Sequence, residues 1–431
     1  MNKIHAQKKS EAISHNLASN PQRNRNFFRI FSGLLLTFCL GYGNPVLSRG
    51  GNSDPPPLPP NPLEAIAPDP LLPKPPKKNE ELTAEQLREL DTALDELNGE
   101  ASAELAAGNT REAFEIWYRE LRLRRYFGPE TEVEALTRVG AIAWEREQIT
   151  PVQFIEGRMA AIYQANCTGE QTCELSLLER LGQGFQVLRS RDFAIQVYRQ
   201  ILTHARDRQD IPAQEAALTL IGGLYLEKLD YANAAAPYEQ LLNIATSRGN
   251  VPQQIAYIED LAFIYTQANR LEKAIAMRQR LVRYYSTPES GQKIPELKLA
   301  IATDYETLGY LQSAINTYQE TYTLAWAQQQ FYIARDALQA LARIYKNAEQ
   351  IDAALEVYEA LLLVDRRAYN LYGIMNTYDE IGQLHLEQNN YANAERAFKN
   401  ALEIARQLNY QEAYFTEKIQ QLSNPRNRIN Y

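Results

Sequence analysis

The chain has 431 residues, with 45 Lys and Arg against 53 Asp and Glu, which gives a formal net charge of −8. This acidity argues against binding to a nucleic-acid backbone, which requires a surface rich in Lys and Arg. Three Cys and four His are too few for a disulfide-rich scaffold or a metal centre built from cysteine. The 26 Tyr are an unusually large number and require an explanation.

The N-terminus has the pattern of an export signal. Residues 1–29 carry six bases and one acid, and residues 30–40 form a short apolar run. This run has the length of a signal-peptide core, roughly 7–15 residues, and is shorter than the ~18 residues of a transmembrane helix. We expect residues 1–48 to be a signal peptide, with an uncleaved N-terminal anchor as the alternative. Both place the rest of the chain in the periplasm or thylakoid lumen, and loss of residues 1–48 changes the net charge from −8 to −13.

Residues 49–79 are predicted to form a proline-rich, disordered linker. Eleven of the 21 Pro lie in residues 54–76. Because Pro lacks the amide hydrogen and fixes φ, we expect an extended, unpacked spacer. A proline-rich ligand for a partner protein is the alternative.

From residue 80 onward the sequence has a helical pattern, opened by a capping box at Thr83–Gln86, and it repeats itself with a 40-residue period. An alanine marks each repeat, at Ala194, Ala234, Ala274, Ala314, Ala354 and Ala394. A small residue lies twelve positions earlier, at Gly182, Gly222, Ala262, Ala302, Ala342 and Gly382.

Large side chains lie at two further fixed positions of each repeat. Nine residues before each marker alanine are Phe185, Tyr225, Tyr265, Tyr305, Tyr345 and His385. Four residues after it are Tyr198, Tyr238, Arg278, Tyr318, Tyr358 and Phe398. Small residues let two antiparallel helices approach closely, and aromatic residues one turn away fill the space beside the contact. This accounts for many of the Tyr, and we expect the aliphatic stem of Arg278 to cover the surface that an aromatic covers elsewhere.

This small–aromatic pattern, seen for example in residues 181–198 and 381–401, resembles the tetratricopeptide repeat (TPR) family, with 40-residue repeats in place of the common 34-residue form. The resemblance implies an all-α fold, an α-solenoid in which helix hairpins form a right-handed superhelix and bury their apolar faces by stacking. The extra residues should lengthen both helices. We expect degenerate repeats in residues 80–174, six regular repeats in 175–408, and a capping helix and tail in 409–431.

The sequence contains no HExxH, P-loop, GxSxG or Rossmann glycine motif. We therefore expect no enzymatic activity, with an unrecognised site on an acidic face as the alternative. His385 occupies a core register and is interpreted as a packed, hydrogen-bonded histidine. Cys167 and Cys173 are expected to form a disulfide if the chain is exported, and to be two free thiols if it is cytosolic.

The family resemblance implies that a protein or peptide partner binds on the concave face, which is lined by the first helix of each hairpin. By family register, and with a shift of one position allowed for the long repeats, this face contains Glu179, Gln183, Glu227, Glu259, Phe263, Gln267, Glu296, Thr303, Glu306, Asp336, Gln339, Arg343, Lys346, Asp379, Gln383 and Glu387. The set is acidic and polar, with Arg343 and Lys346 as a basic island. The alternative is that the acids merely solubilise the surface.

Export, repeat number and acidity together also resemble the exported, processing-associated TPR factors of photosystem II assembly. That resemblance implies a membrane-complex subunit as partner and handling of Mn²⁺, for which we name no ligands; otherwise no cofactor is expected. A regulatory TPR module that senses a peptide is the alternative function. The basic cluster Arg119–Arg125 lies at the end of a predicted helix, where positive charge interacts favourably with the helix dipole. The alternative is that it contacts anionic headgroups or an acidic partner segment. The N-terminal segment provides a second route to membrane contact.

Overall fold

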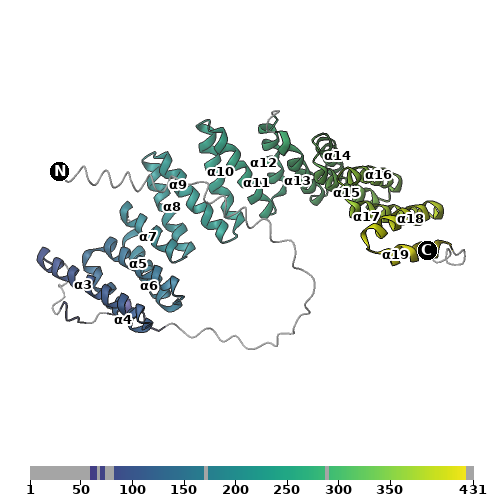
Figure 1. Cartoon of the computed structure of the whole chain (residues 1–431). Helices are drawn as coiled ribbons and strands as arrows, with labels where there is room; N and C mark the ends of the chain where they lie inside the picture. Colours follow the sequence, from purple (N-terminus) through teal and green to yellow (C-terminus); the bar gives the residue numbers. More distant parts are fainter. Residues whose placement is uncertain (1–58, 66–67, 73–81, 169–172, 287–290, 424–431) are drawn as a thin grey trace. The chain divides into compact units, whose positions relative to one another are not determined.

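The computed structural model describes residues 59–65, 68–72, 82–168, 173–286 and 291–423, and these residues form helices and loops without a β-strand (Figure 1). The expected signal segment, residues 1–48, lies outside them. The chain divides into two compact units, residues 1–220 and 221–431, and α9 (Ile211–Glu227) crosses the boundary. No helix in the described ranges is both long and apolar enough to cross a membrane.

The first unit contains two irregular hairpins followed by a regular one. The capping box predicted at Thr83 is confirmed, because the Thr83 side chain accepts from Gln86 N and the Gln86 side chain accepts from Thr83 N. The helices are η1 (Pro62–Glu64), α3 (Ala84–Ala106), α4 (Thr110–Arg124), η2 (Arg125–Phe127), α5 (Pro129–Glu145), α6 (Ile149–Cys167), α7 (Leu175–Val187) and α8 (Arg191–Asp207).

The second unit continues the hairpins to the end of the described chain, and consecutive helices pack on one another. Its helices are α10 (Tyr231–Ser247), α11 (Val251–Gln267), α12 (Leu271–Tyr284), η3 (Gly291–Lys293), α13 (Ile294–Thr307), α14 (Leu311–Ala327), α15 (Phe331–Asn347), α16 (Ile351–Arg367), α17 (Leu371–Glu387), α18 (Tyr391–Leu408) and α19 (Glu412–Ser423).

The predicted 40-residue code is confirmed by burial. Each of the six marker alanines, from Ala194 to Ala394, is 0% exposed. Their aromatic neighbours Tyr318 and Phe398 are 1% and 0% exposed. The expected lengthening of both helices is also seen, since α14, α15, α16 and α17 each have 17 residues.

Helix ends recur with half the period of the sequence repeat. A residue with left-handed backbone, φ between 49° and 77°, follows most helices at 20-residue intervals, a common way for a helix to end. Among the described residues, these left-handed positions are Arg189, Gln209, Leu229, Gly249, Asn269, Gly309, Gln329, Glu349, Tyr369, Asn389 and Asn409. Only two of them are glycines.

A polar contact also recurs with the period of the sequence repeat and links the second helix of one hairpin to the first helix of the next. The Gln279 amide donates to Tyr305 Oη at 3.2 Å, and the Gln319 amide donates to Tyr345 Oη at 3.4 Å. The hydroxyl of Tyr265 donates to a Glu at the equivalent position. His385 takes the aromatic place in the last hairpin; it is half-buried, and its Nδ1 has no hydrogen-bond partner in the described chain.

Arg278 does more than cover apolar surface. Its guanidinium pairs with Asp304 on α13 and donates from Nη2 to Thr266 Oγ1 at 2.7 Å. Asp304 is buried and Arg278 is half-buried, and burial lowers the pKa of Arg278 and raises the pKa of Asp304. The position therefore exchanges an aromatic contact for an ion pair between neighbouring hairpins.

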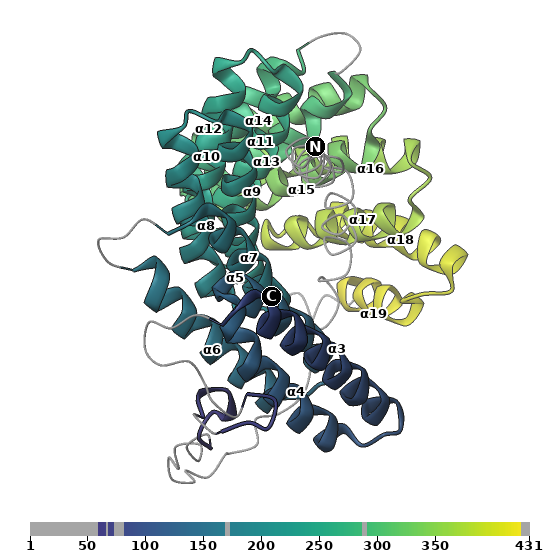
Figure 2. The same ribbon diagram turned by 90° about the vertical axis from the view of Figure 1, so that its left-hand side faces the viewer.

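Part of the proline-rich segment is packed, which corrects the expectation of an unpacked spacer over residues 49–79. We call residues 59–65 and 68–72 the strap; in Figure 2 the strap lies beside α4 and α6. Leu63 and Leu72 are 1% and 8% exposed, and Leu72 shares a core cluster with leucines of α3 and α4. The prediction did not consider that burial of the Leu63 and Leu72 side chains is favourable and that the neighbouring prolines do not prevent it.

The basic cluster on α4 is occupied from within the chain. Arg119 binds both carboxylate oxygens of Asp69 in the strap, at 2.8 Å each. Arg122 Nη1 donates to the Pro62 carbonyl at 3.1 Å, and Arg125 donates to the Leu63 carbonyl. Of the contacts predicted for this basic cluster, the structure shows the one with an acidic segment, and this segment belongs to the same chain.

Cys167 and Cys173 are joined by a disulfide, with an S–S distance of 2.05 Å. The bridge connects the end of α6 to the residues before α7, which lie on either side of the undescribed residues 169–172. Both cysteines are buried, at 6% exposure each.

Candidate groove on α15

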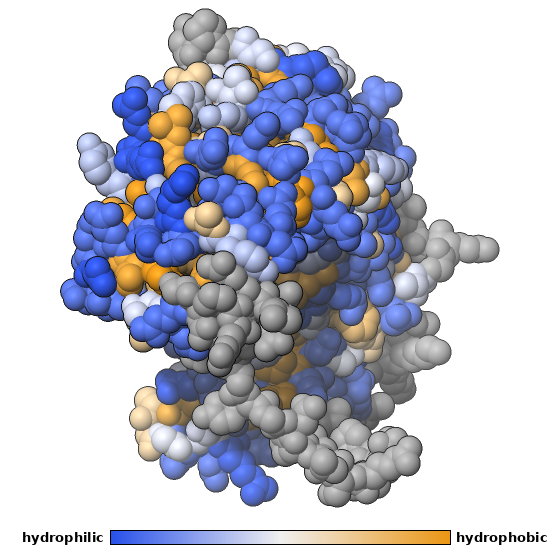
Figure 3. Space-filling view, turned by 90° about the vertical axis from the view of Figure 1, so that its right-hand side faces the viewer, coloured by the Kyte–Doolittle hydropathy of each residue, from blue (hydrophilic) through white to orange (hydrophobic). Residues whose placement is uncertain are grey.

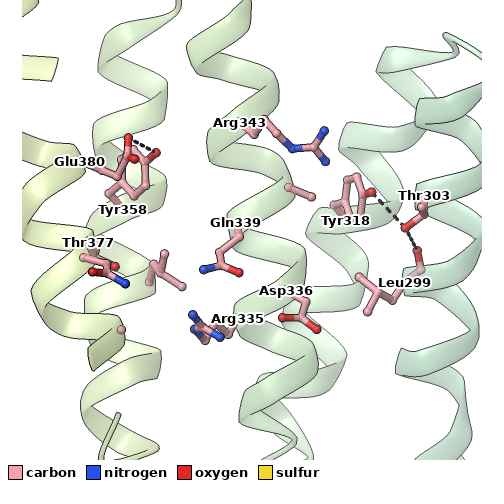
Figure 4. A pocket seen from close by; sticks show the side chains of 14 residues that line it. Leu299, Thr303, Tyr318, Arg335, Asp336, Gln339, Arg343, Tyr358, Thr377 and Glu380 are labelled. Atoms are coloured by element: carbon pink, nitrogen blue, oxygen red, sulfur yellow. Dashed lines mark hydrogen bonds between the residues drawn. The ribbon is translucent and has the colours of Figure 1, made fainter. Parts of the chain in front are cut away.

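The second unit has a cavity of about 590 Å³ along α15, bordered by α13 and α14 on one side and by α16 and α17 on the other. Figure 4 shows Arg335, Asp336 and Gln339 on the central helix, between the flanking side chains. Residues on α15 at positions i, i+1, i+4 and i+8 share one face, which explains why this helix supplies four polar side chains to one cavity. The lining mixes these polar groups with apolar ones such as Leu299 and Leu361.

Asp365, at the end of α16, is fully buried beside this cavity. It accepts a hydrogen bond from Asn370 Nδ2 at 2.8 Å and forms an ion pair with Arg335 Nε at 3.2 Å. Burial raises the pKa of Asp365, while the Asn370 hydrogen bond and the charge of Arg335 oppose this rise. A Cβ on Gly373 would lie 2.5 Å from Asp365 Oδ2, so the carboxylate approaches α17 closely only because residue 373 has no side chain.

Two ion pairs hold the sides of the groove. Arg343 binds Glu306, with Nη1–Oε1 and Nη2–Oε2 distances of 2.7 and 3.0 Å. The hydroxyl of Tyr318 also donates to Glu306, at 2.9 Å, and burial is the main cause that raises the pKa of Tyr318 to about 12.

On the other side, Lys346 Nζ lies 2.9 Å from Glu380 Oε2, and the hydroxyl of Tyr358 donates to the same oxygen at 3.3 Å. The predicted basic island of Arg343 and Lys346 is therefore not a free positive patch, because each base is paired with an acid of a neighbouring first helix. The sequence alone did not show that Glu306 and Glu380 lie within reach.

Four polar groups of the groove remain available to a ligand. Asp336, Gln339 and Asn376 line the cavity and make no side-chain hydrogen bond within the described ranges. The Nη1 and Nη2 atoms of Arg335 make no hydrogen bond within the described residues, because its ion pair with Asp365 involves Nε. Burial raises the pKa of Asp336, against the opposing charge of Arg335. Amide, carboxylate and guanidinium groups in one cavity match the donors and acceptors of a polypeptide backbone.

The predicted concave-face residues are all exposed or half-buried. Four of the sixteen line this cavity, namely Thr303, Asp336, Gln339 and Arg343. Arg335, Asn376 and Glu380 line it as well but were not in the predicted set. The one-position shift that long repeats allow would have found Arg335 and Glu380, which lie next to predicted residues.

The other predicted residues do not join this cavity, and several are engaged elsewhere. Glu259 accepts from the Tyr285 hydroxyl at 2.8 Å. Asp379 accepts from Gln383 at 3.0 Å and from Tyr414 of α19 at 3.2 Å. Phe263 packs edge-on against Tyr231, with ring centroids 6.0 Å apart. The remaining predicted residues lie outside the cavity lining: Glu179, Gln183, Glu227, Gln267, Glu296, Glu306, Lys346 and Glu387.

The acids do not form a metal site in the residues with described positions: no group of three His, Cys, Asp or Glu side chains there is placed to hold an ion. The face shown in Figure 3 is mostly hydrophilic, with small apolar areas between the polar side chains.

Comparison with known proteins agrees with this architecture. A sequence model of the tetratricopeptide repeat matches residues 336–367 and 376–408, which cover most of α15–α18 and include Asp336, Gln339 and Asn376. No curated protein sequence matches the chain.

Solved structures with similar folds have low identity to this chain. A Rap protein in complex with a competence and sporulation factor is 16% identical, with 77% of this chain and 98% of that chain covered and a TM-score of 0.29. The aspartyl phosphate phosphatase F from Bacillus subtilis is 11% identical, with 67% and 78% covered and a TM-score of 0.36. The C-terminal part of a TPR repeat-containing protein from Cytophaga hutchinsonii is 12% identical, with 62% and 95% covered and a TM-score of 0.36.

These structural scores are too low to support a function. The sequence match is specific to the repeat, and tetratricopeptide repeats are in general protein-interaction scaffolds without enzymatic activity. The matched segments carry the marker residues Ala342, Ala354, Gly382 and Ala394, which recur with the same spacing in the preceding hairpins. The chain therefore contains tetratricopeptide repeats over residues 336–367 and 376–408.

Proposed function

We propose that this protein binds an extended segment of a partner protein in the groove on α15. The single observation that carries the proposal is the set of unpaired polar groups on Gln339, Asn376 and Asp336 in one cavity of a tetratricopeptide-repeat unit. An extended backbone presents donors and acceptors that such groups can satisfy, and the paired side walls of the groove keep it preformed.

We further propose that this binding takes place outside the cytoplasm and serves the assembly of a membrane complex, of which photosystem II is one candidate. The basic residues 1–29 and the apolar residues 30–40 support export, and the predicted net charge of −13 after loss of residues 1–48 suits a binding protein for a basic segment. Fusion of residues 1–50 to a reporter enzyme tests the location, and a cytoplasmic reporter would exclude this part of the proposal.

The double substitution Gln339→Ala and Asn376→Ala is expected to weaken partner binding by about ten- to hundredfold. Each removed side chain forfeits a hydrogen bond worth about 0.5–1.5 kcal/mol, and 1.4 kcal/mol corresponds to a factor of ten. Neither side chain bonds to the rest of the described chain, so the melting temperature should stay unchanged. Calorimetric titration with the partner recovered by affinity capture on the full chain measures the effect.

Gln420→Ala is the matched control, because Gln420 is exposed on α19 and lies outside the cavity lining. It should leave the affinity unchanged. Equal affinities of the double variant and the wild type would place the binding surface elsewhere on the molecule.

A further inference from the structure

The strap is held on the first unit by side chains rather than by backbone pairing. It contains Pro59, Pro60, Pro62, Pro68 and Pro70, which lack the amide hydrogen and cannot contribute to a ladder. Its carbonyls instead accept hydrogen bonds from Arg122 and Arg125, as described above. This is how an extended proline-containing segment is recognised, since carbonyl oxygens are the backbone groups that it can still offer.

Charged and amide contacts fix the register of the strap. Asn61 Nδ2 donates to the Phe154 carbonyl on α6 at 2.8 Å, while Asn61 Oδ1 caps η1 through Leu63 N. Glu64 Oε1 lies 3.3 Å from Arg158 Nη1, and Arg158 Nε lies 2.6 Å from Glu132 Oε1. Together with the two-point contact between Arg119 and Asp69, these bonds are specific to amide and acidic side chains at fixed positions.

Contacts among the helices themselves also hold the surface beneath the strap. On α4, Trp117 is fully buried and packs against Phe114, with ring centroids 5.2 Å apart, and it donates from Nε1 to Asn98 Oδ1 on α3 at 3.0 Å. Tyr118 packs against Phe154 of α6, with ring centroids 5.9 Å apart. Helix-to-helix contacts thus hold α4 against its neighbours, and the described strap residues add only twelve positions to the unit.

We propose that the face formed by α4 and α6 is a binding site for an extended, acidic, proline-containing polypeptide segment, and that the strap occupies it as a ligand carried in the same chain. The site recognises the pattern Asn-Pro-Leu-Glu followed, five residues after the Glu, by Asp and then by Leu. It is separate from the groove on α15, and the proposal does not depend on the function proposed there. Its partner is a protein that presents the same pattern.

The covalent connection determines when the site is open. Nine residues, 73–81, join the strap to the start of the described helical chain at residue 82. A short connection of this kind gives an attached ligand an effective concentration in the millimolar range. A partner segment therefore binds only when it outcompetes the strap or when the strap is released.

Cleavage of the full chain within residues 73–81 tests the proposal, because it keeps every strap contact but makes the strap a separate molecule. A specific protease site replaces part of this stretch, and binding of a fluorescent peptide with the sequence of residues 59–72 is followed by anisotropy. The uncleaved chain should bind the peptide at least about a hundredfold more weakly than the cleaved chain, which exchanges its strap for the peptide.

A site variant separates recognition from folding. Arg119→Ala in the cleaved chain should weaken peptide binding by about ten- to hundredfold, because a two-point charged contact is lost. Arg111→Ala, an exposed arginine at the start of the same helix, should leave it unchanged. Helical circular dichroism should persist when the strap is washed out.

Three results would overturn the proposal. One is loss of helical structure when the strap leaves, which would make the strap a part of the fold. The second is failure of the cleaved chain to exchange its strap for the peptide. The third is equal binding by the Arg119→Ala and Arg111→Ala chains.

Discussion

Glu120→Ala is expected to lower the free energy of unfolding of the first unit by about 3–5 kcal/mol, the typical cost of removing one partner from a buried ion pair. Glu120 is 0% exposed. Both of its carboxylate oxygens accept from Arg138 Nη2 at 2.7 Å, and Oε1 also accepts from Arg124 Nε at 3.1 Å. Without this carboxylate, two guanidinium groups from α4 and α5 lose their shared counter-charge inside the unit.

Urea unfolding of the full chain, followed by hydrogen exchange, measures this loss and assigns it to residues 82–168. Glu115→Ala is the matched control, because Glu115 lies on the same helix and is exposed. The control should change the free energy of unfolding by less than about 0.5 kcal/mol. Equal effects of the two substitutions would show that Arg124 is sufficiently paired by Asp91 and Asp95, each at 2.6 Å.

Phe398→Ala is expected to destabilise the second unit by about 3–5 kcal/mol, as large-to-small changes in a core do. Phe398 is 0% exposed and belongs to the last core cluster with Ala394 and Phe415. Its ring also lies against the backbone of Gly382, where an added Cβ would approach Phe398 Cε1 to 2.6 Å. The small and large positions of the repeat code are thus in direct contact in this hairpin.

This contact gives a second, sharper readout. Gly382→Ala alone should cost about 1–3 kcal/mol, because the new methyl group overpacks the contact with Phe398. In the Phe398→Ala chain the same change should stabilise by about 1 kcal/mol, the gain in helix propensity from Gly to Ala. The sign reversal is measured by a double-mutant cycle in urea unfolding. The same effect of Gly382→Ala in both backgrounds would mean that the two positions do not depend on each other.

The fold was predictable because its determinants are local and repeated. Ala354 and Tyr358 are separated by one helical turn, and the same pair recurs in neighbouring hairpins, so a single geometric rule explains many positions. Arg278 shows where the rule ends. The break in the aromatic register was visible, but its partner Asp304 lies 26 residues away on another helix, and only the packed structure brings the two charges together.

The groove was predictable only in part, for a similar reason. Its position on first helices follows from the repeat, and so Asp336 and Gln339 were found. Which polar groups are free depends on pairing between helices: Arg343 looked available until Glu306 was seen to bind it. The strap was missed because its composition indicates an extended chain, while its burial depends on Leu63 and Leu72 and on arginines that are distant in the sequence.

The left-handed residues that end successive helices imply that the backbone does not distinguish a turn within a hairpin from a turn between hairpins. Gln329 and Glu349 have φ values of 59° and 57°, yet the first follows a second helix and the second follows a first helix. The 40-residue unit therefore exists only in the side chains. Duplication of a single helix with its turn would continue the main chain smoothly, but it would lose the contact between the small residue of a first helix and the aromatic residue of a second helix, as between Gly382 and Phe398. An array that keeps this contact grows by whole pairs of helices.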